Sequence, residues 1–210
     1  MVLYVIMAII AYAIGSISFS VIISRKMAGF DVREKGSGNA GSTNMLRSVG
    51  KKAALLTLVC DILKGVVAIA ISLLIGKFNS SVDKAILVQI AAVAVVIGHT
   101  FPIFFEFRGG KGVATSLGVI ILVNWQIGLI CLVFALVLMI LTRMVSLGSI
   151  CAAILFPVLT VFIHEHYIVD GNYIIFGIIM AAFIAYNHRS NIKRLLSGTE
   201  NKISFKKTEN

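Results

Sequence analysis

The chain has 210 residues, of which 59% are hydrophobic and only 13% are charged, whereas soluble domains carry about twice that charge. Several apolar runs reach the ~20 residues that a bilayer-spanning helix needs. The composition therefore excludes a soluble protein and predicts an all-α, polytopic membrane protein with residues 1–210 in a single bundle. The net charge of +10 is too scattered for a nucleic-acid-binding stripe and fits membrane orientation and anionic ligands.

Seven membrane-spanning helices are predicted along the chain. Residues 2–24 form the first apolar run, which lacks the basic start and the cleavage site of a signal peptide and is expected to be retained. Ser16, Ser20 and Ser24 recur in it every fourth residue, which predicts one close-packing helix face. The other expected spans are 53–75, 85–98, two helices within 113–141, 150–163 and 173–187.

The run 113–141 is too long for one comfortable span and short for two. Asn124, Trp125 and Gln126 form a polar patch with an interfacial aromatic residue in its middle. We therefore expect a hairpin of two short or tilted helices that turns at this patch.

Lysines and arginines set the expected orientation. Sixteen of the nineteen lie in the segments 25–52, 99–112, 142–149 and 188–210, which fall on one side of a seven-helix arrangement. The positive-inside rule places that side in the cytoplasm and the N-terminus outside. Treating 113–141 as one helix would export the C-terminal tail with its six basic residues, which favours the hairpin.

One charged pair lies inside a predicted span. Asp61 and Lys64 are three residues apart and share a helix face, and a lone charge near mid-bilayer costs at least ~2.5–3.5 kcal/mol. The pair is interpreted either as a structural ion pair facing the bundle or as part of a polar cavity below the cytoplasmic loops. Gly65 beside it would let another helix approach closely.

Two glycine-rich segments are candidates for anion binding. From Gly36 to Arg47 the chain is small and polar, so backbone N–H groups could converge on an anion and Arg47 could add a bidentate fork; an ordinary flexible loop is the alternative. Residues 108–112 (Arg-Gly-Gly-Lys-Gly) precede a helix N-terminus, which favours anions, although a positive-inside anchor has the same pattern. His99, just past a predicted helix end, is either a general base or a cap for backbone carbonyls.

The basic tail from His188 has two interpretations. It is either an amphipathic surface helix over anionic lipid or a segment that brings His188 and Asn191 into the site formed by the other loops. No metal site is predicted. The turn after the sixth span holds a loose group of metal-ligating types, His164, Glu165, His166 and Asp170. No second cluster completes a ligand set, which favours a solvated turn.

The three cysteines lie within apolar runs, have no metal spacing and are interpreted as small buried hydrophobic residues. They are Cys60, Cys131 and Cys151.

Three motifs, taken together, resemble the bacterial acyl-phosphate:glycerol-3-phosphate acyltransferases of the plasma membrane. They are Gly36 to Asn44 with Arg47, Gly98 to Pro102 followed by Gly109 to Thr115, and His188-x-x-Asn191 followed by Arg194, Leu195, Gly198 and Glu200. The resemblance covers nearly the whole chain, including seven helices and an external N-terminus. Ala40 stands where many members have proline, a departure expected to loosen that loop without removing a ligand.

The resemblance implies transfer of a fatty acyl group from acyl phosphate to the sn-1 hydroxyl of glycerol 3-phosphate. The products are lysophosphatidic acid and phosphate, in the first acylation step of phospholipid synthesis. It implies no cofactor, a multi-pass protein of the cell membrane and a site on the cytoplasmic face. The expected partners are the two substrates, membrane lipid and, as a candidate, the enzyme that makes acyl phosphate; nucleic acid is not among them.

The resemblance also names the site. The catalytic residues, which match those that bind phosphate groups in the family, are Ser37, Arg47, Lys111, His188 and Asn191. The expected substrate-binding residues are Gly38, Asn39, Thr43, Asn44, His99, Gly110, Gly112 and Ser149.

The chemistry of these residues agrees with that reaction. Both substrates carry phosphate and acyl phosphate is already activated, so the enzyme needs mainly to neutralise and position charge. No Ser-His-Asp set and no H-x-x-x-x-D motif is evident. The donor's own phosphate is expected to accept the hydroxyl proton, with His188 as the rival base.

Two other functions are weighed. A transporter for phosphorylated solutes would have a charged path and repeated halves, and no internal repeat is found. Transfer from acyl-CoA or acyl carrier protein would require a docking surface that these short loops hardly offer.

Overall fold

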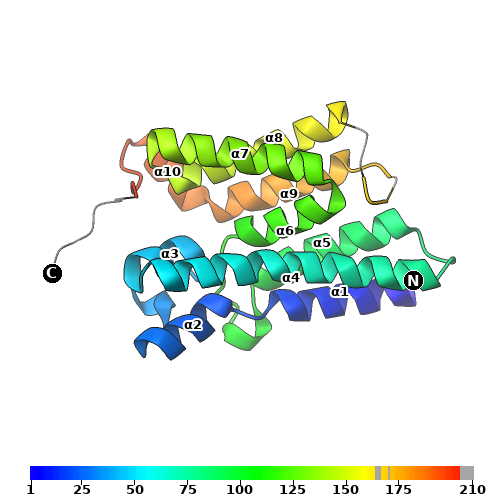
Figure 1. Cartoon of the computed structure of the whole chain (residues 1–210), viewed down its shortest axis with the longest axis horizontal. Helices are drawn as coiled ribbons and strands as arrows, with labels where there is room; N and C mark the ends of the chain where they lie inside the picture. Colours follow the sequence, from blue (N-terminus) through cyan, green and yellow to red (C-terminus); the bar gives the residue numbers. More distant parts are fainter. Residues whose placement is uncertain (164–166, 170, 204–210) are drawn as a thin grey trace. The chain divides into compact units, whose positions relative to one another are not determined.

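The computed structural model describes residues 1–163, 167–169 and 171–203, and these ranges contain helices and no strand. Ten α-helices and two short 3-10 helices follow one another along the described chain (Figure 1). Their bounds are α1 Val2–Gly15, α2 Phe19–Ala28, η1 Val32–Glu34, α3 Ser42–Ser48, α4 Lys51–Phe78, α5 Lys84–Thr100, η2 Ile103–Phe105, α6 Val113–Val123, α7 Trp125–Thr142, α8 Val145–Phe162, α9 Ile174–Asn187 and α10 Arg189–Leu196. The all-α prediction is confirmed.

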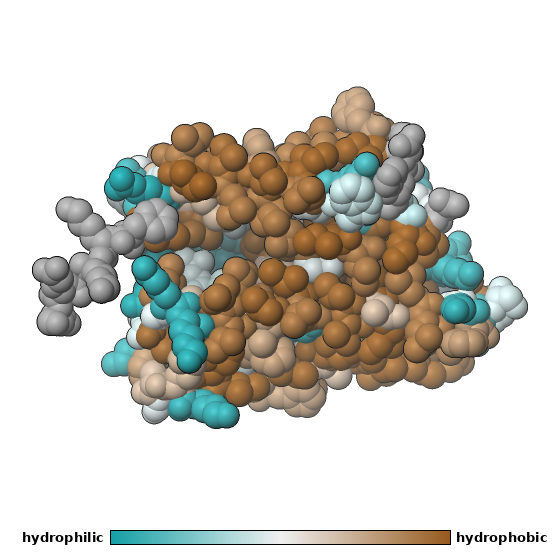
Figure 2. All heavy atoms as spheres, in the orientation of Figure 1, coloured by the Kyte–Doolittle hydropathy of each residue, from teal (hydrophilic) through white to brown (hydrophobic). Residues whose placement is uncertain are grey.

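These helices fall into two compact units, Met1–Gly128 with Glu165–Asn172, and Leu129–His164 with Tyr173–Asn210. The prediction that 1–210 form a single domain stays a prediction. Five helical segments among the described residues are long and apolar enough to cross a membrane. Their flanks are covered by apolar side chains, and hydrophilic residues gather at helix ends (Figure 2). Together these features describe a multi-pass membrane protein.

In the first unit α4, which has 28 residues, contacts α1, α2, α3, α5 and α6. Glycines allow the closest of these approaches. A Cβ on Gly65 of α4 would lie 2.3 Å from the Thr115 carbonyl oxygen, and one on Gly118 of α6 would lie 2.1 Å from the Ile62 carbonyl oxygen. A side chain at either position would force α4 and α6 apart, so the prediction that Gly65 permits close helix packing is confirmed.

The first apolar run is not one helix, so the predicted continuous helix over 2–24 is wrong. α1 ends at Gly15 and α2 begins at Phe19. Ser16, Ser20 and Ser24 are all buried, but the break keeps them from sharing one helix face. The local sequence does not predict this break. The side chain that stabilises it comes from a distant segment of the chain.

The predicted break inside 113–141 is confirmed. α6 and α7 are separated by Asn124, whose backbone is extended (φ −150°, ψ 103°). Its Oδ1 accepts the Ile127 N–H at 3.1 Å, which caps the start of α7. α6 has 11 residues and is therefore only ~16 Å long, which agrees with the expectation of a short helix in this hairpin.

Several predicted loop boundaries are wrong. The segment 25–52 contains η1, α3 and the first residues of α4. The segment 142–149 is mostly helical, because α8 begins at Val145 and only Arg143 and Met144 separate it from α7. His99 lies in the last turn of α5, which ends at Thr100, and not beyond the helix.

In the second unit α8 packs against α9. A Cβ on Gly177 would lie 3.0 Å from Pro157 Cα, and the rings of Phe156 and Phe176 meet edge to face with centroids 5.9 Å apart. The tail contains a helix, α10, which follows α9 through His188, and both interpretations of the tail stay predictions.

Candidate functional site

The first glycine-rich segment is folded around the buried side chain of Asn44 in α3. Its Nδ2 donates to three backbone carbonyls of the loop at 2.9–3.0 Å, those of Val32, Lys35 and Asn39. Its Oδ1 accepts the Ser37 N–H at 2.9 Å. Gly36 has φ +59°, and a Cβ there would lie 2.3 Å from Asn44 Oδ1. One amide side chain thus bonds to the loop at four backbone positions, which favours an ordered loop over the flexible alternative.

The other residues predicted from this motif surround that centre. Ser37 and Gly38 are exposed, and Asn39 and Thr43 are half-buried. Arg47 is exposed in the last turn of α3, so its guanidinium is accessible to an anion in solution.

The second glycine-rich segment folds back onto the end of α5. The Gly109 N–H donates to the Thr100 carbonyl and the Gly110 N–H to the His99 carbonyl, each at 3.1 Å. A Cβ on Gly110 would lie 2.1 Å from His99 Nε2 and 2.8 Å from the Ala40 carbonyl oxygen. The Ala40 N–H also donates to the Gly109 carbonyl at 3.4 Å. The two glycine-rich loops therefore lie in direct contact.

Lys111 follows this contact and leads into α6. Its side chain is half-buried, and Gly112 is the N-cap of the helix with φ +86°. A cation that directly precedes a helix N-terminus and stands between two glycines favours a bound anion. The predicted residues Lys111, Gly110 and Gly112 thus lie beside the first loop in the same unit.

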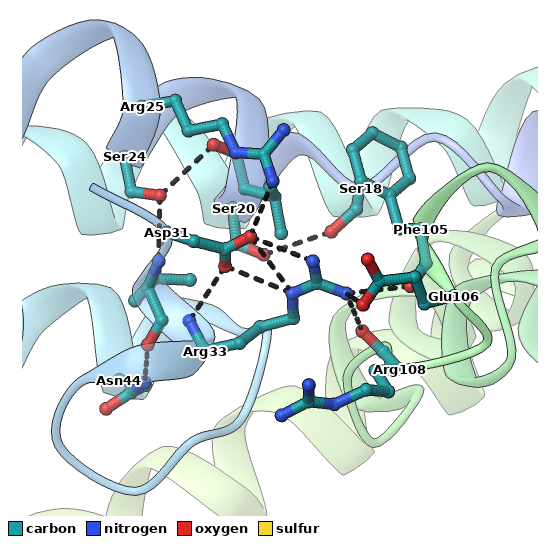
Figure 3. A network of polar contacts seen from close by, with 12 residues as sticks. Ser18, Ser20, Ser24, Arg25, Asp31, Arg33, Asn44, Phe105, Glu106 and Arg108 are labelled. Atoms are coloured by element: carbon teal, nitrogen blue, oxygen red, sulfur yellow. Dashed lines mark hydrogen bonds and ion pairs between the residues drawn. The ribbon is translucent and has the colours of Figure 1, made fainter. Parts of the chain in front are cut away.

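A second set of contacts joins the segments that directly precede these two loops, through Arg33, whose side chain is buried. Figure 3 shows its guanidinium facing the carboxylate of Asp31. Its Nη2 lies 2.8 Å from Asp31 Oδ2, and its Nη1 donates to the Phe105 carbonyl at 2.7 Å. On the other side Arg25 Nη2 lies 2.9 Å from Asp31 Oδ2. A buried ion pair just before the first loop therefore holds the backbone of η2, just before the second.

The pKa of Asp31 follows from these neighbours. Burial by itself would raise it, but the hydrogen bonds and positive charge of Arg33, with a hydrogen bond from Arg25, more than offset burial. They lower the pKa to about 2. Asp31 is therefore ionised at neutral pH and acts as an anchor for Arg33, not as a proton-transfer group.

Asp61 and Lys64 form a buried ion pair in α4, with Lys64 Nζ 3.0 Å from Asp61 Oδ1. His99 Nδ1 lies 3.5 Å from the same oxygen. The structural ion pair, one of two interpretations of Asp61 and Lys64, agrees with these contacts. Of the two interpretations of His99, the cap for backbone carbonyls does not agree with the position of the ring, because Nδ1 faces the Asp61 carboxylate.

The residues of the third motif lie in the second unit. His188 Nδ1 lies 2.8 Å from the Ile184 carbonyl oxygen, and because a carbonyl can only accept, Nδ1 is the donor in this contact. Asn191 Nδ2 donates to Glu200 Oε1 at 2.8 Å, and Arg194 Nε donates to Glu200 Oε2 at 3.0 Å. Glu200 thus joins Asn191 to Arg194 and fixes the chain that follows α10.

Burial by itself would raise the pKa of Glu200. The hydrogen bond from Asn191 and the charge and hydrogen bond of Arg194 are among the contacts that lower it instead. Ser149, expected to bind substrate, is buried in the first turns of α8, and its hydroxyl donates to the Val145 carbonyl at 2.9 Å.

Comparison with known proteins identifies the family. The sequence profile described as glycerol-3-phosphate acyltransferase matches residues 5–198. The chain belongs to the glycerol-3-phosphate acyltransferase family. It is 43% identical over 204 residues to the glycerol-3-phosphate acyltransferase of Clostridioides difficile, covering 97% of each chain. It is 45% identical over 202 residues to that of a Thermoanaerobacter species, covering 96% of each.

Solved structures agree with this assignment. The fold is similar to that of PlsY, an integral membrane glycerol 3-phosphate acyltransferase, in its glycerol 3-phosphate form, with a TM-score of 0.82, 37% sequence identity and 96% of each chain covered. The lysophosphatidic acid form matches with a TM-score of 0.80 and 35% identity, over 96% of this chain and 95% of that one. An acyltransferase is therefore favoured over the transporter considered from the sequence.

Sequence reasoning missed three residues that organise the site of this acyltransferase. Asp31 and Arg33 belong to none of the three motifs, and no local pattern shows that Arg33 bonds to a carbonyl 72 residues away. Glu200 stands inside the third motif, and its position there was the one signal that could have identified it.

The structure describes the cysteines and part of the metal-ligating side chains. Within the described ranges, no group of three or more metal-ligating side chains lies together. The residues weighed as a metal cluster lie outside the described residues; they are His164, Glu165, His166 and Asp170. Cys131 is buried, whereas Cys60 and Cys151 are half-buried, and all three are free thiols.

Proposed function

We propose that this protein transfers a fatty acyl group from acyl phosphate to the sn-1 hydroxyl of glycerol 3-phosphate, releasing lysophosphatidic acid and phosphate. The observation that carries the proposal is the contact between the two glycine-rich loops, through the Ala40 N–H and the Gly109 carbonyl. It brings together two segments of the kind that bind phosphate, one followed by Arg47 and the other containing Lys111. The names of the relatives supply glycerol 3-phosphate as the acceptor.

The roles of the first-unit residues follow from their positions. The Ser37 hydroxyl and the Arg47 guanidinium offer exposed side-chain donors on the first loop, and Lys111 offers a cation at the start of α6. Gly38 is exposed beside them, with its N–H donating to the Lys35 carbonyl at 3.1 Å. Donors and cations fixed before the substrates arrive stabilise negative charge without a reorganisation cost. Asn44 has four loop hydrogen bonds, so its proposed role is to shape the loop and not to touch substrate.

His188 and Asn191 retain their proposed places among the residues that handle phosphate, and Ser149 is retained as a substrate-binding candidate. With Nδ1 directed at the Ile184 carbonyl, the rival base His188 would act through Nε2. The donor phosphate is nevertheless the proposed proton acceptor, because phosphate leaves the acyl carbon as the new bond to oxygen forms and ends with the proton. Charge neutralisation by Arg47 and Lys111 then favours this leaving group.

The proposed topology keeps seven membrane passages, with the N-terminus outside and the loops 25–52 and 99–112 and the tail on the cytoplasmic face of the cell membrane. The distribution of lysine and arginine supports it. A reporter fused after Asn210 should be protected from protease added outside the cell. Cleavage of that reporter in intact cells would overturn the orientation.

Purified protein in detergent tests the reaction. We expect release of inorganic phosphate from a long-chain acyl phosphate only when glycerol 3-phosphate is present, with equimolar formation of lysophosphatidic acid. Acyl-CoA and acyl carrier protein thioesters, supplied in parallel, should give no product. Product formation from a thioester but not from acyl phosphate would overturn the proposed donor while leaving the acceptor in place.

A further inference from the structure

The middle of α4 holds a buried ionic cluster. Lys64 Nζ lies 3.0 Å from Asp61 Oδ1, and it donates to the carbonyls of Gly15 at 3.0 Å and Ile17 at 3.1 Å. Three oxygens thus surround one ammonium group, whose three N–H bonds they satisfy. Two of these oxygens belong to the break between α1 and α2, so Lys64 stabilises that break.

Asp61 extends the cluster towards the second glycine-rich loop. The carboxylate oxygen that faces Lys64 also lies 3.5 Å from His99 Nδ1. The opposite nitrogen of the ring, Nε2, packs against the Cα of Gly110, where an added Cβ would lie only 2.1 Å away. The His99 backbone carbonyl accepts the Gly110 N–H at 3.1 Å. Gly110 is therefore held from one residue by both a ring contact and a hydrogen bond.

We propose that Asp61 and Lys64 are positioning residues for acyl transfer. By fixing the His99 ring, they set the place of Gly110 and hence of Lys111, and through the Gly109 carbonyl the place of Ala40 in the first loop. Neither residue needs to touch a substrate. The inference rests on the proposed function, because Lys111 is taken to bind a phosphate group.

Burial distinguishes this cluster from a surface ion pair. The side chains of Asp61, Lys64 and His99 are 3%, 3% and 6% exposed. Taking charges out of water is costly, and a buried ion pair is often no more stable than an apolar replacement. Stability alone therefore does not account for these residues, whereas fixing a binding loop to within a fraction of an ångström does.

Asp61→Asn tests the proposal because it keeps the shape of the side chain and removes its charge. We expect the KM for one of the two phosphate substrates to rise about tenfold or more, as misplacement of a binding group does. If Asp61 acts through the His99 ring, the same change in a His99→Ala background should alter KM by less than about twofold, because the ring that transmits the effect is absent. An equal rise in both backgrounds would overturn the proposal.

A second variant covers the case in which Asp61→Asn alone does not fold. In the double variant Asp61→Asn/Lys64→Gln neither replaced side chain carries a charge, so no unpaired charge is left buried. The glutamine still has two N–H donors for the carbonyls at the helix break. We expect this protein to fold, with the raised KM retained. A folded double variant with wild-type KM for both substrates would also overturn the proposal.

Asp83→Ala is the control for a general loss of stability. Asp83 caps α5 at its other end, where its Oδ1 accepts the Ile86 N–H at 3.0 Å, so its loss should lower the melting temperature without moving the loops. If KM rose as much in Asp83→Ala as in Asp61→Asn, the effect would be a consequence of lost stability, and the proposal would be overturned. Calorimetric binding of glycerol 3-phosphate to the same proteins separates a failure of the inference from a failure of the proposed donor, because it needs no turnover.

Discussion

The backbone N–H of Ala40 donates a hydrogen bond to the carbonyl oxygen of Gly109, with nitrogen and oxygen 3.4 Å apart. Ala40 is 2% exposed and belongs to the first glycine-rich loop, whereas Gly109 opens the second. Proline at this position, as in many members of the resembling enzymes, has no N–H to donate. Alanine therefore supplies an N–H to this contact that proline could not supply, and the expectation that alanine loosens the first loop stays a prediction.

Ala40→Pro should weaken this contact. Loss of one hydrogen bond costs about 1 kcal/mol, which corresponds to about a fivefold rise in the KM of a substrate held between the loops. Initial-rate measurements with each substrate varied in turn would detect it. Ala40→Gly is the matched control, because it keeps the N–H and should leave KM within about twofold of wild type. Wild-type kinetics in Ala40→Pro would show that the bond has no part in binding.

Asn44→Asp should destabilise the first loop and weaken anion binding. Aspartate has the size of asparagine but no amide N–H, so three carbonyls lose their donor and a negative charge enters the loop. We expect a loss of about 1–3 kcal/mol of stability, seen as a lower melting temperature in detergent, and weaker glycerol 3-phosphate binding by calorimetry.

Asn79→Asp at the end of α4 is the matched control for Asn44→Asp. It removes one donor, to the Ile75 carbonyl at 2.8 Å, far along the helix from the loops. It should leave substrate binding unchanged. Equal losses of binding in the two variants would contradict the role given to Asn44.

The sequence predicts those features that depend on local pattern. Long apolar runs predict the helices, because a helix that crosses the lipid needs about 20 apolar residues. The polar Asn124 predicts the break between α6 and α7. The spacing of Asp61 and Lys64 predicts their pairing on one helix face.

Features that depend on distant partners were not predictable in this way. The break between α1 and α2 occurs in an apolar run because Lys64 supplies donors to the carbonyls of Gly15 and Ile17. Arg33 similarly bonds to Phe105, which lies 72 residues away. Only the tertiary fold brings these groups together, so no window of local sequence contains the information.

Asp31 gives the protein a predicted pH dependence of stability. Its pKa is lowered from 3.8 to about 2 in the folded protein, so the unfolded state binds the proton more tightly. The stabilisation is therefore fully present above about pH 4 and is lost as the pH falls towards the folded-state pKa. The melting temperature of wild type should fall over this range more steeply than that of Asp31→Asn. Glu34→Gln, which changes an exposed neighbour in η1, should follow the wild-type curve; parallel curves for wild type and Asp31→Asn would refute the assignment.

Glu200→Gln should disrupt the second unit. The carboxylate accepts hydrogen bonds from Asn191 at one oxygen and from Arg194 at the other. A glutamine amide offers only one acceptor, so its NH2 group would meet one of these donors in a site where Glu200 is 8% exposed.

A buried donor left unpaired costs about 1–3 kcal/mol, and the displaced Asn191 should lower kcat if it handles phosphate as proposed. Glu106→Gln is the control, because Glu106 is 72% exposed and lies 3.8 Å from Arg33, and such a surface pair contributes at most about 1 kcal/mol. Melting temperatures and kcat measured for both variants decide the matter. A Glu200→Gln protein as stable and as active as Glu106→Gln would mean that Glu200 does not position Asn191.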